Sequence, residues 1–149
     1  MIVRVHLPPH IADEIRLHAE QTYPDECCGF LLGTVDEHGV RHVKHVAPTP
    51  NRAPAGTERD RYHIGPADYL RIDRKARTMG WDILGIYHSH PDGTDTPSAV
   101  DLATAWPWYI YLILSVRSGR TVSCRTWTLD PNPQSPRFNE AQSTPDAPL

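Results

Sequence analysis

Short runs of apolar residues, several of them alternating with polar ones, predict extended segments along most of the chain. Two longer stretches instead repeat apolar residues at helical spacing, and each is opened by proline. Strands that alternate with helices, with hairpin turns at 36–39 and 118–119, indicate an α/β fold in which helices flank one mixed sheet. The predicted strands are residues 2–7, 27–35, 40–47, 82–87, 108–116 and 121–129, and the predicted helices are residues 8–23, 66–79 and 98–105.

The apolar positions also predict which side chains fill the core. The unbroken apolar run at 27–35 is typical of a central strand, which is covered on both faces. We expect Trp106 and Trp108 to pack under the last hairpin, with contact to a substrate as the less favoured alternative. The expected core contacts of the two longer helices are Ile11, Ile15, Leu17, Tyr69, Leu70, Ile72 and Ala76.

Two proline-rich segments interrupt this pattern. Residues 48–60 hold three prolines, one glycine and several charges, which predicts a mobile surface loop that could cover a substrate groove. Residues 130–149 hold five prolines among polar residues, and we expect a disordered tail there. The predicted organisation is one folded domain over residues 1–129, followed by a tail over residues 130–149.

Composition argues against several classes of protein. Fifteen Lys and Arg against eighteen Asp and Glu give a net charge of −3, without the basic stripe typical of nucleic-acid binding. No run of apolar residues could span a membrane, no polybasic segment could anchor the chain to one, and the first residues lack the apolar stretch of a signal peptide. Cys27, Cys28 and Cys124 match no disulfide framework or zinc knuckle, so we expect free, mostly buried thiols in a cytoplasmic protein.

The candidate chemistry lies in the segment His88-Ser89-His90-Pro91 and in Asp101 downstream of it. Side chains two residues apart project from the same side of a strand, so both imidazoles face one site. With a carboxylate at the same site, two nitrogens and one oxygen leave a fourth position open on zinc. This coordination is typical of catalytic rather than structural zinc sites, and it predicts a metal-activated water.

Other interpretations of these residues need no metal. Ser98 and Asp101 also match a helix-capping pattern, which is the better interpretation of that pair alone. Because His88 and His90 lie at a spacing that suits a shared metal, we favour metal binding over capping for Asp101. Glu26 alone could be a solvated residue at the start of a strand. We favour surface, structural or packing roles for His42, His45, His63, Cys27 and Cys28.

The same residues resemble the motif of the JAMM/MPN+ zinc metalloprotease family, which is an upstream glutamate, then His-x-His-Pro, six residues, Ser, two residues and Asp. The chain matches every spacing from His88 to Asp101, and the segment around Glu26 resembles the family's glutamate strand, especially in bacterial members. The resemblance implies the JAMM/MPN fold, with an architecture similar to that of cytidine deaminases. It also implies that His88, His90 and Asp101 bind zinc, that Glu26 is the general base for a zinc-bound water, and that Ser98 donates a hydrogen bond to the oxyanion.

Resemblance to this family also implies the reaction. Catalytic relatives cut peptide or isopeptide bonds after the C-terminal Gly-Gly of ubiquitin-like proteins, and several stand-alone bacterial members process ubiquitin-fold sulfur carriers. Because the chain keeps every polar position of the motif, we expect a zinc-dependent peptidase acting on a ubiquitin-like or sulfur-carrier protein. The carrier, the leaving group and the oligomeric state stay open, and the ligand set also suits iron, cobalt or nickel.

The alternative is a non-catalytic MPN-type protein-binding module that keeps a metal only for stability. A third hypothesis, a zinc deaminase, requires H-x-E together with P-C-x-x-C, and the chain lacks this combination because it has no P-C-x-x-C. Hydrolysis with the metal present separates the two remaining hypotheses, because both bind metal.

Overall fold

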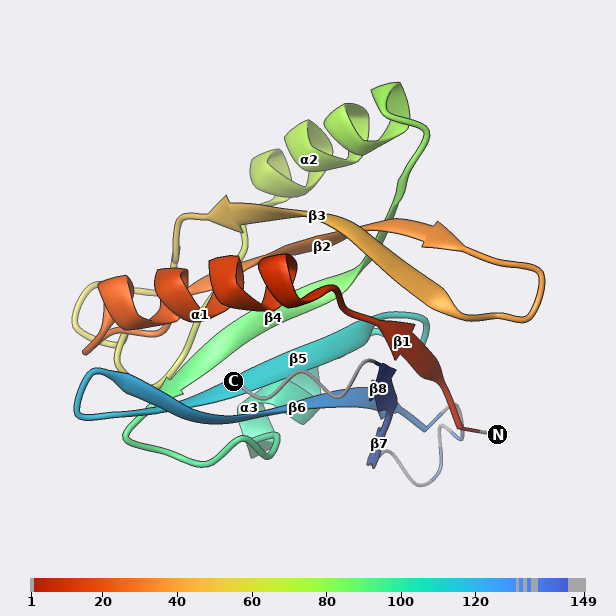
Figure 1. Cartoon of the computed structure of the whole chain (residues 1–149). Coiled ribbons are helices and arrows are strands. Elements are labelled where there is room, and N and C mark those ends of the chain that lie inside the picture. Colours follow the sequence, from red (N-terminus) through yellow and green to blue (C-terminus); the bar gives the residue numbers. More distant parts are fainter. Residues whose placement is uncertain (1, 131, 133, 135–136, 145–149) are drawn as a thin grey trace.

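The computed structural model describes residues 2–130, 132, 134 and 137–144, which form one mixed sheet with helices packed against it (Figure 1). This confirms the predicted fold class. The helices are α1 (Pro9–Thr22), α2 (Pro66–Thr78) and α3 (Ala99–Thr104). The strands are β1 (Arg4–His6), β2 (Cys28–Val35), β3 (Arg41–Thr49), β4 (Asp82–Pro91), β5 (Ile110–Arg117), β6 (Arg120–Leu129), β7 (Phe138–Glu140) and β8 (Gln142–Thr144).

The order of strands across the sheet is β7-β6-β5-β4-β2-β3-β1-β8. β4 runs parallel to β5, and β1 runs parallel to both β3 and β8, whereas the other neighbours are antiparallel. Because β4 and β5 are parallel neighbours, the chain must cross over between them, and α3 lies in that crossover. β2 and β4 occupy the middle of the sheet, as the unbroken apolar run of β2 predicts.

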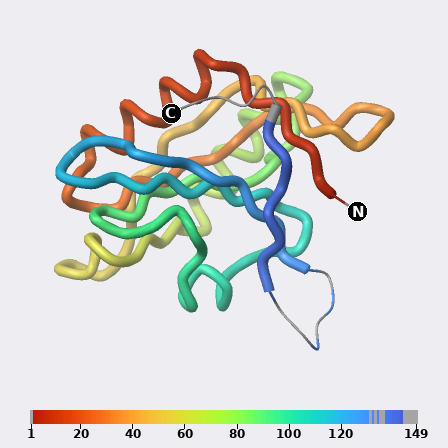
Figure 2. Tube along the Cα trace, turned by 60° about the horizontal axis from the view of Figure 1, so that its bottom comes forward, coloured from red at the N-terminus to blue at the C-terminus, as the bar shows by residue number. Residues whose placement is uncertain are grey.

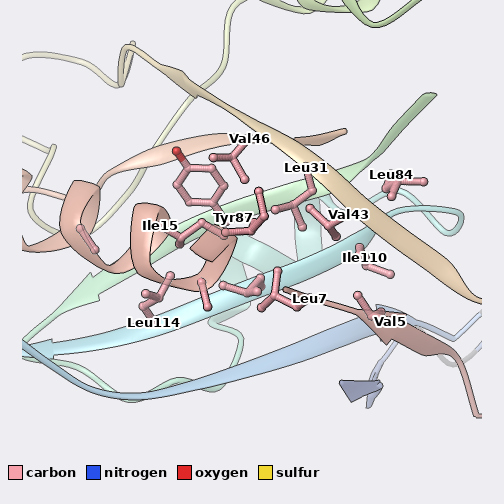
Figure 3. Packing of buried hydrophobic residues seen from close by; sticks show 14 of the residues in the cluster. Val5, Leu7, Ile15, Leu31, Val43, Val46, Leu84, Tyr87, Ile110 and Leu114 are labelled. Atoms are coloured by element: carbon pink, nitrogen blue, oxygen red, sulfur yellow. The ribbon is translucent and has the colours of Figure 1, made fainter. Parts of the chain in front are cut away.

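Side chains of the central strands alternate between two apolar layers, one on each face of the sheet. Leu31 and Tyr87 lie in the layer covered by α1 (Figure 3). Phe30 and Ile86, one residue away in each strand, lie in the layer covered by α2. Gly29 is required where β2 passes the first layer, because a Cβ atom there would overlap the ring of Tyr87. The position of a residue in this alternation therefore decides which helix it faces.

Both long helices begin and end within two residues of their predicted bounds, but two of their predicted core residues are wrong. Leu17 is 54% exposed and Leu70 is 52% exposed. Each lies two positions from a buried isoleucine, Ile15 or Ile72, and two positions turn a side chain about 200° around a helix. The buried stripes instead continue through small residues, Ala19 in α1 and Ala76 in α2.

The segment 137–144 corrects the prediction of a disordered tail. β7 pairs with β6, and β8 pairs with β1, so one short segment joins the two edges of the sheet (Figure 2). The N–H of Ala141, between the two strands, donates to the carbonyl of Thr126 at 2.8 Å, and the N–H of Gln142, the first residue of β8, donates to the carbonyl of Val3 at 2.9 Å. The rest of the predicted tail (131, 133, 135–136 and 145–149) lies outside the described residues, and the domain boundary at residue 129 stays a prediction.

The polar composition misled here because main-chain hydrogen bonds hold this segment, with only Phe138 and Ala141 as apolar contacts. Two exposed strand edges offer unpaired N–H and C=O groups that any extended segment can satisfy. Main-chain pairing depends little on side-chain type, so composition alone does not reveal it.

Trp106 and Trp108 do not pack under the last hairpin, which corrects a second prediction. Trp106 is 62% exposed and Trp108 is 48% exposed, in the turn between α3 and β5. A hydrogen bond from the N–H of Tyr109 to the carbonyl of Trp106, at 3.2 Å, closes this turn. Tyr111 and Phe138 pack against each other near the hairpin instead, with ring centroids 5.6 Å apart. None of the described helices is long and apolar enough to cross a membrane.

Candidate metal centre

Four polar side chains meet where β2 begins and β4 ends. Cys28 pairs with His88 in the antiparallel register, so both point to the face covered by α2. Glu26, two residues before Cys28, shares that face, and continuing the register places it opposite His90. One ligand atom each from Glu26, His88 and His90 lies within 4.8 Å of the others. The first turn of α3 adds Asp101.

The distances among the predicted ligand atoms fit a tetrahedral zinc site. Asp101 Oδ1 lies 3.1 Å from His88 Nε2, and Asp101 Oδ2 lies 3.1 Å from His90 Nε2. The two Nε2 atoms lie 3.1 Å apart. Ligands at zinc distances of roughly 2.0–2.1 Å would lie about 3.3 Å from one another in a tetrahedron. Two histidine nitrogens and a carboxylate at these spacings form a donor set that suits a divalent cation.

Burial and mutual contacts set the charges of these groups. His88 is fully buried, and burial lowers its pKa, so the ring is neutral at neutral pH. Burial alone would favour a protonated Asp101, but hydrogen bonds with His88 and His90 hold its pKa far below the usual range. Burial also disfavours a charge on His90, yet Asp101 raises the pKa of this ring. A neutral imidazole and an ionised carboxylate are the forms that bind metal.

Both imidazole rings are held in place by neighbouring groups. His90 Nδ1 lies 2.7 Å from the carbonyl oxygen of Thr94. If Nδ1–H donates to this oxygen, the lone pair of Nε2 is left facing the site. The ring of Tyr62 lies 4.4 Å from that of His88, at an angle of 31°. Between the histidines, Ser89 Oγ accepts the N–H of Cys27 at 2.9 Å, which ties the two strands together.

Glu26 has the properties of a proton acceptor beside this ligand set. Its side chain is buried, and Oε1 has no hydrogen-bond partner among the described residues. Burial raises the pKa of Glu26 to about 8, against the opposing effect of His90. Its main chain is fixed, since its N–H donates to the carbonyl of Glu58 at 2.7 Å and its carbonyl accepts from Asn51 at 3.2 Å. A pKa near neutral pH suits a general base, and a divalent cation held beside Glu26 would favour its ionised, proton-accepting form.

Ser98 and Asp101 form the capping box that was the alternative interpretation of this pair. The N–H of Asp101 donates to Ser98 Oγ at 3.1 Å, and the N–H of Ser98 donates to Asp101 Oδ2 at 2.8 Å. The same carboxylate contacts both histidines, so the cap is compatible with the predicted role of Asp101 as a metal ligand. The hydroxyl of Ser98 accepts in the cap and keeps its own proton to donate, and its role toward an oxyanion stays a prediction.

Sequence reasoning missed Asn51, which ties the loop at 50–65 to the site. Its Nδ2 donates to the carbonyls of Glu26 and Arg61, at 3.2 and 3.0 Å. Its Oδ1 accepts the N–H groups of Ala53 and His63, at 3.0 and 3.1 Å. An asparagine among prolines signals a turn, but these partners follow only from tertiary contacts. The predicted surface loop is thus anchored beside Glu26, while its mobility and its cover of a groove stay predictions.

The other side chains considered in the sequence lie outside the ligand set. His42 Nε2 contacts Asp36 Oδ2 at 2.8 Å, and His45 stacks on Trp81 with ring centroids 5.9 Å apart. His63 is exposed and contributes its main chain to the loop. Cys27 and Cys28 are buried, and burial raises the pKa of both thiols to about 12, in keeping with packing roles.

Comparisons with known proteins bear on this site. A family model described as prokaryotic homologues of the JAB domain matches residues 8–130. A Haloferax volcanii protein named desampylase is 36% identical over 85% of this chain and 90% of its own length. A Thermus thermophilus protein named probable TtuB-protein conjugate cleaving protease is 31% identical over 76% of this chain and 74% of its own. The solution structure of a Salinibacter ruber protein is 38% identical, with a TM-score of 0.71 over 99% of this chain and 95% of that protein.

Proposed function

The chain belongs to the family of prokaryotic JAB-domain homologues, a branch of the JAMM/MPN+ hydrolases, and we propose that it cuts protein conjugates with the help of zinc. The proposed reaction is hydrolysis of the peptide or isopeptide bond after the C-terminal Gly-Gly of a ubiquitin-like or sulfur-carrier protein. The observation that carries this proposal is the buried, unpartnered carboxylate of Glu26 beside His88 and His90.

In the proposed mechanism, His88, His90 and Asp101 hold the metal. A zinc ion held by these residues would lower the pKa of water to about 7 and would supply a Lewis acid for the scissile carbonyl. Glu26 Oε1 accepts the proton of the attacking water and then delivers it to the leaving amine. A positioned base of this kind contributes roughly 10²–10⁴-fold to the rate. The hydroxyl of Ser98 donates a hydrogen bond to the developing oxyanion, a contact worth about 3 kcal/mol in other enzymes.

Support for the substrate class comes from two directions. The motif residues resemble those of enzymes that act on ubiquitin-like proteins, and the name of the Thermus thermophilus relative describes cleavage of a protein conjugate. A C-terminal Gly-Gly tail is flexible and carries no side chains, so it can reach a buried centre such as that around His88. We place the reaction in the cytoplasm, where the free thiols of Cys27 and Cys28 stay reduced.

The test is to incubate the zinc-loaded protein with a panel of ubiquitin-like and sulfur-carrier proteins that extend beyond Gly-Gly. We expect mass spectrometry to show a product that ends at Gly-Gly together with the released extension. If the chain binds zinc but cleaves no carrier, while His88→Ala unfolds it, the binding-module alternative holds instead. The Glu26→Gln variant, loaded with zinc in the same way, is the control for contaminating proteases.

A further inference from the structure

Aromatic side chains line two adjoining pockets on the side of the sheet covered by α2. The larger pocket, of about 460 Å³, is lined by Tyr69, Trp106, Trp108 and Tyr109, together with a proline. The smaller pocket, of about 210 Å³, is lined by Tyr62 and Ile86 among others. We refer to the two pockets together as the aromatic trough.

The aromatic trough is continuous with the metal centre. Tyr69 and Trp106 line both pockets, so the pockets share a wall. In the smaller pocket, Tyr62 lies against the ring of His88, with centroids 4.4 Å apart. Ile86, in the same pocket, precedes His88 by two residues on the same face of β4. A polypeptide bound at the metal centre therefore has this trough beside it.

The walls of the trough are held in place, although its two indoles are exposed. The ring of Tyr69 packs edge-on against Phe30, with centroids 4.9 Å apart. The N–H of Trp106 donates to the hydroxyl of Tyr111 at 2.6 Å, and the guanidinium of Arg41 lies 5.1 Å from the ring of Trp108. A preformed apolar hollow with exposed tryptophans is typical of a ligand site. A bound ligand buries this apolar surface, and the walls of the pocket lose little entropy because they are already ordered.

We propose that the aromatic trough binds an apolar side chain of the segment released by cleavage and so sets a preference for what the carrier is attached to. This inference rests on the proposed function. Two residues of strand span about 6.6 Å, so a substrate extended along β4 from His88 would bring its second residue to the pocket beside Ile86. On the carrier side those two positions are glycines, which have no side chain. The released side therefore supplies the side chain that fills the trough.

The test uses one carrier whose Gly-Gly is followed by Ala-Phe-Ser or by Ala-Gly-Ser. We expect the wild type to prefer the phenylalanine adduct at least tenfold in kcat/KM, chiefly through KM, a ratio that corresponds to about 1.4 kcal/mol. Trp106→Ala and Tyr69→Ala should reduce this preference to less than threefold. Leu17→Ala, which removes an exposed apolar side chain from α1, should keep it.

A binding measurement makes the result independent of turnover. Zinc-loaded Glu26→Gln protein, titrated with the two adducts in a calorimeter, should bind the phenylalanine adduct at least tenfold more tightly. Equal affinities for the two adducts, or equal kcat/KM in the wild type, would show that the trough does not bind the released side chain, and would leave the proposed hydrolase function unaffected. If Trp106→Ala weakens both adducts equally, the body of the carrier fills the trough and the inference is wrong. Failure of the wild type to cleave either adduct counts against the proposed function alone.

Discussion

Asp101 belongs both to the helix cap with Ser98 and to the cluster with His88 and His90. This explains why its sequence context fits both a capping pattern and a metal motif. Oδ2 accepts the N–H of Ser98 in the helix cap, while the carboxylate lies 3.1 Å from both histidine Nε2 atoms. The cap fixes the direction in which the carboxylate points, and a fixed ligand loses less entropy on binding a metal. At the scale of single residues, the capping pattern and the metal motif are therefore two descriptions of one arrangement.

The two roles of this pair can be separated by substitution. Asp101→Asn keeps an oxygen that can accept the N–H of Ser98 but loses the charge, so zinc affinity should fall by at least about 100-fold, the upper range seen for weaker perturbations of metal sites. Stability of the metal-free protein should change little. Ser98→Ala should instead cost about 0.5–2 kcal/mol of stability and retain zinc. Zinc titration against a competing chelator measures the affinity, and urea unfolding in the presence of chelator measures the stability. If Asp101→Asn keeps its zinc affinity but loses stability, Asp101 serves only in the helix cap.

At the scale of elements, the sequence predicts what local periodicity controls. Apolar spacing predicts α1, α2 and the strands β1 to β6, and the fixed spacing from His88 to Asp101 predicts the ligand set. Asn51 and Tyr62 were missed because their roles come from how a loop closes against distant strands. Trp106 was misplaced because large apolar residues are usually buried, whereas a tight turn here keeps its indole exposed.

The loop at 50–65 is joined to α2 by a charged contact whose strength should depend on pH. Arg52 Nε donates to Asp68 Oδ2 at 3.0 Å, and Arg71 lies 3.5 Å from the other carboxylate oxygen. Hydrogen bonding to Arg52 lowers the pKa of Asp68 below its ordinary value of 3.8. A lowered pKa in the folded state adds stability above the ordinary value, and this stability is lost as the pH falls through the folded-state value.

Asp68→Asn should therefore lower the free energy of unfolding at pH 7, and the difference from wild type should shrink as the pH falls below about 4. The measurement is urea unfolding of both proteins at several pH values, with chelator present throughout so that loss of metal in acid does not contribute. A difference that stays constant from pH 7 to pH 2.5 would show that the charge of Asp68 contributes nothing.

At the scale of the whole molecule, β7 and β8 pair with β6 and β1, which lie at opposite ends of the sheet formed by the first six strands. β7 covers the last three residues of β6, and β8 covers β1, so part of each sheet edge is paired and withdrawn from pairing with other chains. The segment lies at the edges of the sheet, whereas the proposed metal ligands lie on its central strand β4 and on α3. The edge strands can therefore be removed without deleting a proposed metal ligand.

Removal of residues 138–149 should destabilise the protein without abolishing the metal site. We expect a loss of about 3 kcal/mol or more, because several main-chain hydrogen bonds worth roughly 0.5–1.5 kcal/mol each are lost. Calorimetry should show a lower Tm, and light scattering should show association through the freed edges. A chain that ends at Thr144 is the control, since it keeps both strands. An unchanged Tm in the shorter chain would mean that β7 and β8 add nothing to the fold.

The central claim is that Glu26 is the base that acts beside a metal held by His88, His90 and Asp101. The most direct test compares wild type and Glu26→Gln on one carrier adduct extended beyond Gly-Gly, with the zinc content of both proteins measured first. The account predicts a full equivalent of zinc in each protein and a fall in kcat of roughly 10²–10⁴-fold in the variant. A zinc-loaded Glu26→Gln protein that cleaves the adduct as fast as the wild type would contradict it.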